Sequence, residues 1–337
     1  MNADYTVFVD ESFYEWFGLP KKESNLCYGA LSLPTARLPD LVRFENAVRH
    51  LAFDELPDAE KAKRTAAEIK YSDFRHFSPE TIDYLGQKLD YFLTKNGASI
   101  FGFFVPAEGF MNYKLRSDFI DEAEGLKSLS EDEYKRRIGA IRQEMLKEWE
   151  DAEHNIGLLS ECYKTFFNFI VQFHGRFLKK TFCVIYDSRN AQEDAELHHE
   201  AEEFATLADR VTPGTFARYR GYETSTSGDS PGLRLVDWIA GEVRGFFRKN
   251  PAVLGGDSSF DILSPYWNPK MIIIEGGPFY RRELSAEAIA CFNSTGKGFM
   301  LPQIKKHFAS GFLTYYAQHG EARNISIPEL VAYDIAD

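Results

Sequence analysis

Short runs of β-branched and aromatic residues alternate with amphipathic helical patterns along most of this chain. The runs lie at residues 5–12, 25–33, 98–105, 181–190 and 216–224, and the helical patterns at 40–53, 78–97, 162–178, 193–211 and 228–247. The first two runs predict a hairpin. Strands that alternate with helices predict an α/β fold, in which a mixed sheet is covered by helices on both faces. With 337 residues, 44% of them hydrophobic, the chain can bury a sizeable core.

Two stretches depart from this alternation. Residues 112–155 are densely charged and carry an apolar stripe at helical spacing. They predict a helical insertion, which either packs internally or mediates a homo-oligomer or a protein partner. After residue 250 the pattern loosens into loops, a strand-like run MIIIEGG and a helix predicted around 301–318. We therefore expect one domain over 1–250 and a C-terminal α/β extension over 251–337.

Charge and composition narrow the classes of function. The formal net charge of −12 argues against a protein that coats nucleic acid non-specifically, although it is compatible with a local basic groove. No run matches a membrane span, and the first residues lack the pattern of a signal peptide. The four cysteines are widely spaced, without a disulfide or zinc pattern. These features predict a cytoplasmic protein that does not enter a membrane.

Carboxylates stand where the predicted elements would bring them together. Asp10 and Glu11 close the first strand, Asp187 closes a later one, Glu68 lies in the segment AEIK, and Asp237 lies at the edge of the apolar arc of a late helix. Acids at the carboxyl ends of strands, joined by an acid from a covering helix, meet at one edge of a sheet. Mg²⁺ or Mn²⁺ suits such oxygen ligands better than zinc does. Taken alone, Asp187 is more typical of a surface or capping residue than of a metal ligand.

Four basic residues accompany these acids: Lys70, Arg234, Arg244 and Arg248. Arg234 lies one turn before Asp237, and it either neutralises that acid in a salt bridge or holds a phosphate. Arg244 and Arg248 continue the same stripe of the helix, either as contacts to a nucleic-acid backbone or as ordinary surface residues. Lys70 either orients a phosphate or pairs with Glu68.

The segments FVDES, EIK, VIYDSR and SPGLRLVDWIAG resemble, in order and approximate spacing, an uncharacterised prokaryotic family named domain of unknown function 3800. The resemblance covers residues 4–248. Asp10 and Glu11 match the DE pair that the family carries on its first strand, and Asp237 matches the aspartate of its late Q-x-x-D motif. Glu68, Lys70 and Asp187 match less rigidly kept positions. The sequence departs from the family at Arg234, where Gln is usual, and at Phe13, where Gly is frequent.

The family is regarded as having an RNase H-like fold, so the resemblance implies this fold for the mixed sheet. It also implies a metal-dependent nuclease, a hydrolase that cleaves the phosphodiester bonds of DNA or RNA with two Mg²⁺ or Mn²⁺ ions. Asp10, Glu68, Asp187 and Asp237 would then be the metal ligands and Glu11 a supporting acid. The alternative is a catalytically inactive module with the same fold, in which Arg234 satisfies Asp237 and the acidic face binds a protein.

Overall fold

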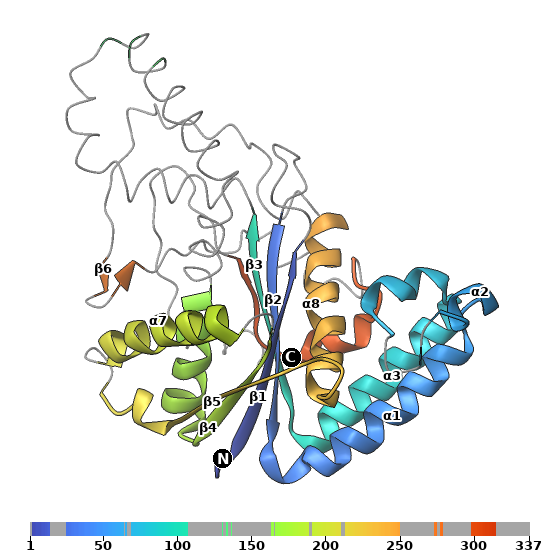
Figure 1. Ribbon diagram of the computed structural model, residues 1–337, viewed down its shortest axis with the longest axis horizontal. Coiled ribbons are helices and arrows are strands. Elements are labelled where there is room, and N and C mark those ends of the chain that lie inside the picture. Colours follow the sequence, from blue (N-terminus) through green and yellow to red (C-terminus); the bar gives the residue numbers. More distant parts are fainter. Residues whose placement is uncertain are drawn as a thin grey trace.

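A computed structural model describes the larger part of the chain. The described residues are 2–13, 25–63, 65, 69–106, 130, 133, 136, 163–164, 166–188, 191–209, 213–249, 273–274, 277–278 and 298–314. Almost all of the predicted insertion at 112–155 lies outside them. Figure 1 shows the arrangement of the elements.

A six-stranded mixed sheet forms the centre of the described structure. Its strands are β1 (Tyr5–Phe13), β2 (Asn25–Pro34), β3 (Ser99–Pro106), β4 (Phe182–Asp187), β5 (Tyr219–Ser225) and β8 (Phe308–Thr314). They lie in the order β5-β4-β1-β2-β3-β8. β2 is antiparallel to β1 and β3, whereas the pairs β1–β4, β4–β5 and β3–β8 are parallel. The predicted hairpin and the predicted mixed sheet are both confirmed.

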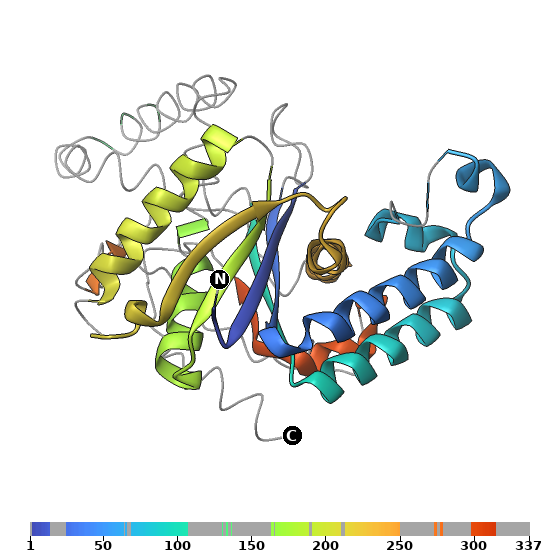
Figure 2. The ribbon, with the colours of Figure 1, turned by 60° about the horizontal axis from the view of Figure 1, so that its bottom comes forward.

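Helices cover both faces of this sheet. On one face lies α8 (Pro231–Lys249), with the antiparallel pair α1 (Leu38–Asp54) and α3 (Pro79–Asn96) outside it (Figure 1). Figure 2 shows α8 nearly end-on between the sheet and that pair. On the other face lie α7 (Ala191–Asp209) and a helical segment over 166–178 that ends in a π-helix, η4 (Phe173–Leu178). This arrangement confirms the α/β class.

Shorter elements connect these layers. They are η1 (Thr35–Arg37), α2 (Asp58–Lys61), η3 (Tyr71–His76), η5 (Phe216–Arg218), η7 (Pro302–His307), and the two-stranded ribbon of β6 (Ile273–Ile274) and β7 (Gly277–Pro278). Of these, η3 contacts α8 and therefore bears on the site described below.

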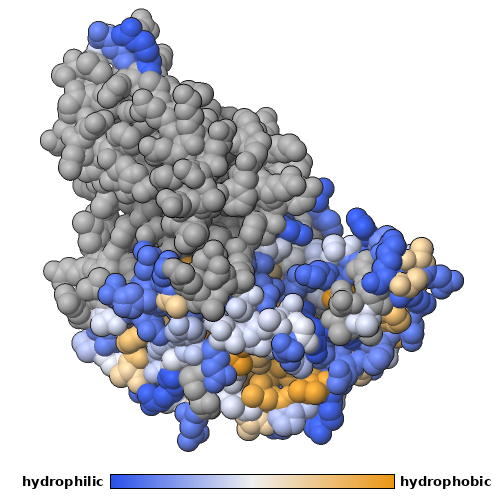
Figure 3. Space-filling view, in the orientation of Figure 1, coloured by the Kyte–Doolittle hydropathy of each residue, from blue (hydrophilic) through white to orange (hydrophobic). Residues whose placement is uncertain are grey.

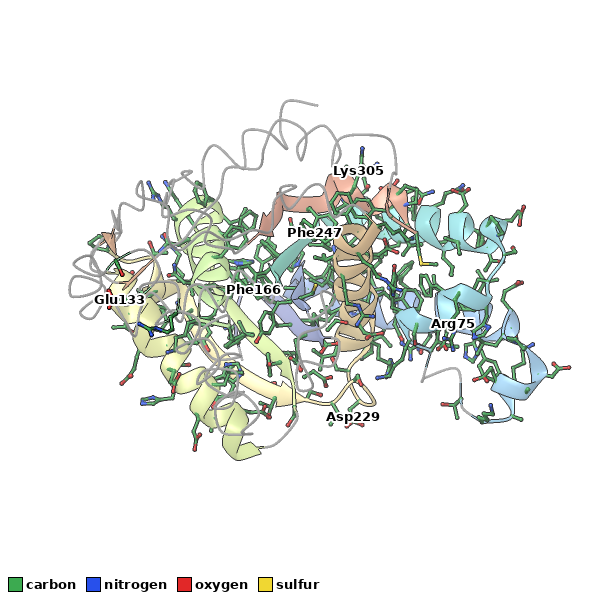
Figure 4. The ribbon with its side chains drawn as sticks, turned by 90° about the horizontal axis from the view of Figure 1, so that it is seen from above. Arg75, Glu133, Phe166, Asp229, Phe247 and Lys305 are labelled. Atoms are coloured by element: carbon green, nitrogen blue, oxygen red, sulfur yellow. The ribbon has the colours of Figure 1, made fainter. Side chains whose placement is uncertain are left out.

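Alternation along the strands divides the core into two clusters. Phe8 of β1 faces α8 and packs with residues such as Leu233 and Phe247, whereas its neighbours Val7 and Val9 face the other helices. Figure 4 labels one residue of each cluster, Phe247 and Phe166. Since successive side chains of a strand point to opposite faces, the parity of a residue number in β1 tells which cluster its side chain joins.

The ends of two helices follow the sequence signals. Ser78 caps α3 by accepting a hydrogen bond from the Thr81 backbone N–H, and the helix stops at Gly97, whose φ of +62° is left-handed. Ser230 accepts from the Leu233 N–H at the start of α8, immediately before Pro231. These local signals therefore set the boundaries that were predicted for both helices.

The C-terminal helix predicted around 301–318 is wrong. Residues 302–307 form η7, and residues 308–314 form β8, which pairs in parallel with β3. A short apolar run such as FASGFLT is compatible with a strand or a helix, and the exposed edge of β3 decides between them. Because β8 completes the same sheet, the boundary expected after residue 250 does not separate the sheet from the chain that follows it.

The described helices contain no segment that is both long and apolar enough to cross a membrane. In the orientation of Figure 3 the described surface is mostly hydrophilic, with one apolar area low in the view. Two of the cysteines, Cys27 and Cys183, are buried thiols.

Candidate active site

Two of the predicted ligands lie on neighbouring parallel strands: Asp187 is the last residue of β4, and Asp10 lies within β1, which continues to Phe13. β1 and β4 run in register from Tyr5 opposite Phe182 to Val9 opposite Tyr186. The next residues along the two strands are Asp10 and Asp187. Phe8 and Ile185 pack in the core under α8, so Asp10 and Asp187, each two residues further on, point to this same face. Asp187 therefore ends its strand as predicted, whereas Asp10 lies inside β1.

Helix α8 brings the third acid over this pair. The helix lies close to the sheet because glycines stand where it crosses the strands: a Cβ on Gly29 would lie 2.8 Å from the Ala240 backbone nitrogen, and one on Gly232 would lie 2.3 Å from the Phe8 ring. Asp237, between these two contacts, is directed at the same end of the sheet.

The charges of the neighbouring acids act on Asp10. The Asp10 side chain is buried, with 6% exposure. Burial raises the pKa of the Asp10 carboxyl well above its ordinary value, and the charges of Glu11, Asp237 and Asp187 raise it further.

The described acids do not form a complete metal-coordination site. Within the described ranges, no three His, Cys, Asp or Glu side chains are close enough together to make a metal site. Glu68, the fourth predicted ligand, lies outside the described residues. The donor chemistry nevertheless fits Mg²⁺ or Mn²⁺, because the three carboxylates offer hard oxygen ligands whose mutual repulsion a divalent cation relieves.

Asp237 is held by η3 rather than by an arginine. Its Oδ2 accepts a hydrogen bond from the backbone N–H of Tyr71 at 3.0 Å. Burial raises the pKa of Asp237, while this hydrogen bond and the positive charges of Lys70 and Arg244 lower it. The Tyr71 ring lies against Gly241, where a Cβ would come within 2.2 Å of the ring. The room that Gly241 leaves on α8 is thus taken by Tyr71.

Asp187 is held by the loop between β5 and α8. Its Oδ1 accepts a hydrogen bond from the Ser227 backbone N–H at 2.9 Å. The neighbouring Ser188 N–H donates to the carbonyl of Ser225 at 2.7 Å and extends the β4–β5 pairing past Asp187. Asp187 is therefore fixed by backbone donors of a specific loop and is more than a surface acid.

Glu11, predicted as a supporting acid, points to the opposite face of the sheet. It follows Asp10 in β1, so the alternation of the strand turns it toward the cluster that contains Tyr186. The Tyr186 hydroxyl donates a hydrogen bond to Glu11 Oε2 at 2.7 Å. Glu11 influences Asp10 through space, but it is not directed at Asp187 and Asp237.

Arg234 does not form the salt bridge to Asp237 that was one of its two predicted contacts. Its Nε and Nη2 donate to the two carboxylate oxygens of Glu45 on α1, each at 2.9 Å, and its side chain is 12% exposed. Its Nη1 donates to the carbonyls of Ser227 and Gly228. A guanidinium used in this way is not available for a nucleic-acid backbone, and the predicted salt bridge to Asp237 is replaced by one to Glu45.

The other predicted basic residues lie near the acids or on the same helix. Lys70 is exposed, Arg244 is half-buried, and both lower the pKa of Asp237 by their charge. Arg248 is exposed in the last turn of α8. The pairing of Lys70 with Glu68 concerns a residue outside the described ranges. The surroundings of Asp237 are thus positive at Lys70 and Arg244.

Several residues that shape the site were not singled out from the sequence. Glu45 is buried on α1, and Arg49 pairs with it one turn later. Both lie at helical spacing within the apolar stripe of α1. A charged residue on the buried side of a helix is the sequence signal that could have indicated a buried ion pair. The contacts of Tyr71 and Ser227 are made by backbone N–H groups, for which side-chain identity gives no signal.

A further buried acid connects this helix to the C-terminal segment. Glu242 of α8 is fully buried, and its Oε2 accepts a hydrogen bond from the Met300 N–H at 3.0 Å. Burial raises the pKa of Glu242 to about 7, against lowering by hydrogen bonds from the backbone of Met300 and Leu301. The segment that leads into β8 is therefore anchored on the site helix.

No family model, curated protein or solved structure matches this chain. The described residues form an α/β protein in which Asp187 and Asp237 interact electrostatically with Asp10 of the central mixed sheet.

Proposed function

We propose that this protein is a divalent-metal-dependent nuclease with an RNase H-like fold. The observation that carries the proposal is that Asp187 of β4 and Asp237 of α8 lie near enough to Asp10 of β1 for their charges to raise its pKa. The order 3-2-1-4-5 of the first five strands, with β2 alone reversed, supports the RNase H-like assignment. So does the resemblance to the domain of unknown function 3800 family.

Asp10, Asp187 and Asp237, together with Glu68, would hold Mg²⁺ or Mn²⁺. When bound, such ions supply an activated water and stabilisation of the leaving oxygen in phosphodiester hydrolysis. The protein itself holds Asp237 through the Tyr71 N–H and Asp187 through the Ser227 N–H. Carboxylates fixed in this way lose little freedom when they bind a cation.

The charges of Lys70 and Arg244 support nucleic acid as the substrate. Both are close enough to Asp237 to lower its pKa. A phosphodiester bound at the acids would place its negative oxygens near these side chains, and cationic side chains position nucleic-acid backbones. Arg248 continues the same side of α8 and would extend this contact.

The alternative is a catalytically inactive module that binds a protein partner. It rested on a pair between Arg234 and Asp237, which is not formed. The open spacing of the described acids is the observation that favours it. A cleavage experiment separates the two functions.

The experiment incubates the purified chain with end-labelled single- and double-stranded DNA and RNA in Mn²⁺, in Mg²⁺ and in EDTA. Asp10→Asn and Asp237→Asn are compared with Asp58→Asn, a control at an exposed position of α2. We expect cleavage that needs metal, that disappears in the first two variants and that persists in the control. Intact substrates in every metal with the wild-type chain would refute the nuclease and favour the binding module.

A further inference from the structure

Arg234 is the centre of a buried network that joins three parts of the fold. On α1, Glu45 receives its two parallel hydrogen bonds. Glu45 also pairs with Arg49, and the side chains of Glu45 and Arg49 are 2% and 4% exposed. On the other side, Arg234 Nη1 reaches the carbonyls of Ser227 at 3.3 Å and Gly228 at 2.7 Å. One guanidinium thus connects α1, α8 and the β5–α8 loop.

The β5–α8 loop contacts both Arg234 and Asp187, and both contacts are made by Ser227. The carbonyl of Ser227 accepts from Arg234, and the N–H of Ser227 donates to Asp187 Oδ1. The loop has internal bonds as well, from the Thr226 hydroxyl to Asp229 Oδ2 and from the Ser230 N–H to the Thr226 carbonyl. Figure 4 labels Asp229 at this turn. The hydrogen bonds of Arg234 to Glu45 connect this loop to a distant helix, α1.

The charges of this network also interact with Asp237. Two arginines against one glutamate leave it one positive charge in excess. Burial and the charge of Arg234 lower the pKa of Arg49 to about 9, while the negative charge of Asp237 acts in the opposite direction. The network is therefore close enough to Asp237 for their charges to interact.

We propose that Arg234 is a positioning residue of the metal site: anchored on Glu45, it fixes the β5–α8 loop and, through the Ser227 peptide, the carboxylate of Asp187. The inference rests on the proposed function, because it assigns a role toward the metal that the acids would bind. It adds a residue from outside the acidic group and gives a role to the half-buried Arg234 beside the buried Arg49.

The geometry of these contacts requires arginine. The guanidinium uses Nε and Nη2 on a carboxylate and Nη1 on two carbonyls at the same time, which its planar fork of donors permits. Glutamine offers one amide nitrogen and no charge, so it cannot satisfy Glu45 and the loop together. Lysine keeps the charge opposite Glu45 but presents a point-like head group without the fork.

The test measures Mn²⁺ binding to the full chain by titration calorimetry, at a temperature where every variant is folded. Wild type, Arg234→Gln and Arg234→Lys are compared, and Asp10→Asn shows that the measured site is the proposed one. Leu89→Ala is a control for lost stability, because it opens a cavity in the buried side of α3. Arg43→Gln removes an exposed arginine that pairs only locally, with Asp40.

We expect Arg234→Gln to lower the affinity for Mn²⁺ about tenfold or more, as is typical when a residue that orients a metal ligand is removed. Arg234→Lys should lower it less, and both controls should bind as the wild type does. Arg234→Lys keeps the test decisive if the Gln variant does not fold.

The outcomes separate the two claims. Wild-type binding that Asp10→Asn abolishes, together with unchanged affinity in both Arg234 variants, overturns the positioning role and leaves the metal site intact. Equal weakening in Leu89→Ala and Arg234→Gln also overturns it, because the effect would then be one of stability alone. A wild-type chain that binds no Mn²⁺ overturns the proposed function, and the positioning role with it.

Discussion

Replacing Gly241 by alanine tests the contact between η3 and α8 that holds Asp237. The added Cβ would lie 2.2 Å from Tyr71 Cγ, 2.4 Å from Cδ1 and 2.6 Å from Cβ. These atoms are at the root of the Tyr71 side chain, so a rotation of the ring cannot remove the clash. The Tyr71 backbone must move, and its N–H donates to Asp237.

The change in the free energy of unfolding caused by Gly241→Ala is the sum of opposing effects. Alanine stabilises a helix by about 1 kcal/mol relative to glycine. Overpacking of this kind costs about 1–3 kcal/mol, and a weakened hydrogen bond to a buried carboxylate costs about 1.5–3 kcal/mol. The expected result is a net loss of about 2 kcal/mol in the free energy of unfolding, opposite in sign to the effect of helix propensity.

The assay is urea unfolding in EDTA, with the midpoint and the slope compared between variants. Gly245→Ala is the matched control on the same helix, because its Cβ would meet the Tyr71 hydroxyl at 2.7 Å and the ring atoms Cζ at 3.6 Å and Cε1 at 3.9 Å, all at the end of the side chain away from the Tyr71 backbone. It should leave stability unchanged or raise it by up to about 1 kcal/mol. A Gly241→Ala chain as stable as the Gly245→Ala chain would refute the reasoning, since Tyr71 would then not be tightly seated.

Three further predictions concern buried polar groups. Because the pKa of Asp10 is raised in the folded chain, its charge destabilises the fold at neutral pH when no metal is bound. Asp10→Asn should therefore raise the melting temperature in EDTA by about 2–4 °C, and the variant should lose any stabilisation by Mn²⁺. A lower melting temperature of the variant in EDTA would contradict this. The pKa of Glu242 is raised from 4.5 to about 7, so the wild type should lose stability as the pH rises between these values, by at most about 1.4 kcal/mol per pH unit. Glu242→Gln should flatten this part of the curve of urea midpoint against pH, and parallel curves would rule out the assignment. Ser32→Ala removes the hydroxyl that lies 2.8 Å from His174 Nε2, while His174 Nδ1 remains bonded to the Ile170 carbonyl. Leaving Nε2 of the buried imidazole without this partner should lower the free energy of unfolding by about 1–3 kcal/mol. An unchanged melting temperature would contradict the contact.

Local patterns were sufficient to predict most of the architecture. The runs that became β1 to β5 have strand composition, and Ser78, Gly97 and Ser230 mark helix ends by local chemistry that needs no knowledge of the rest of the fold. The place of Asp237 on the edge of the apolar arc of α8 likewise follows from helical periodicity. Such features are readable because their cause lies within a few residues.

Long-range partners were not predictable in this way. Arg234 has Asp237 one helical turn away, but it binds Glu45, which lies 189 positions earlier in the chain. The two helices must be packed before this contact exists. The strand at 308–314 is a similar case, because its own seven residues are ambiguous and the edge of β3 settles their conformation. The face of Glu11, by contrast, could have been deduced from strand alternation.

The position of β8 has a consequence for the order in which the protein can be made. β3 leaves the ribosome long before the strand that covers its edge, and β3 is almost entirely apolar. A growing chain therefore carries a hydrophobic strand with unpaired backbone groups, which is the usual template for aggregation. The sheet can close only when residues 308–314 arrive, and Glu242 on α8 provides the anchor for the segment that delivers them. We therefore expect the growing chain to pass through a stage in which that edge is prone to aggregation.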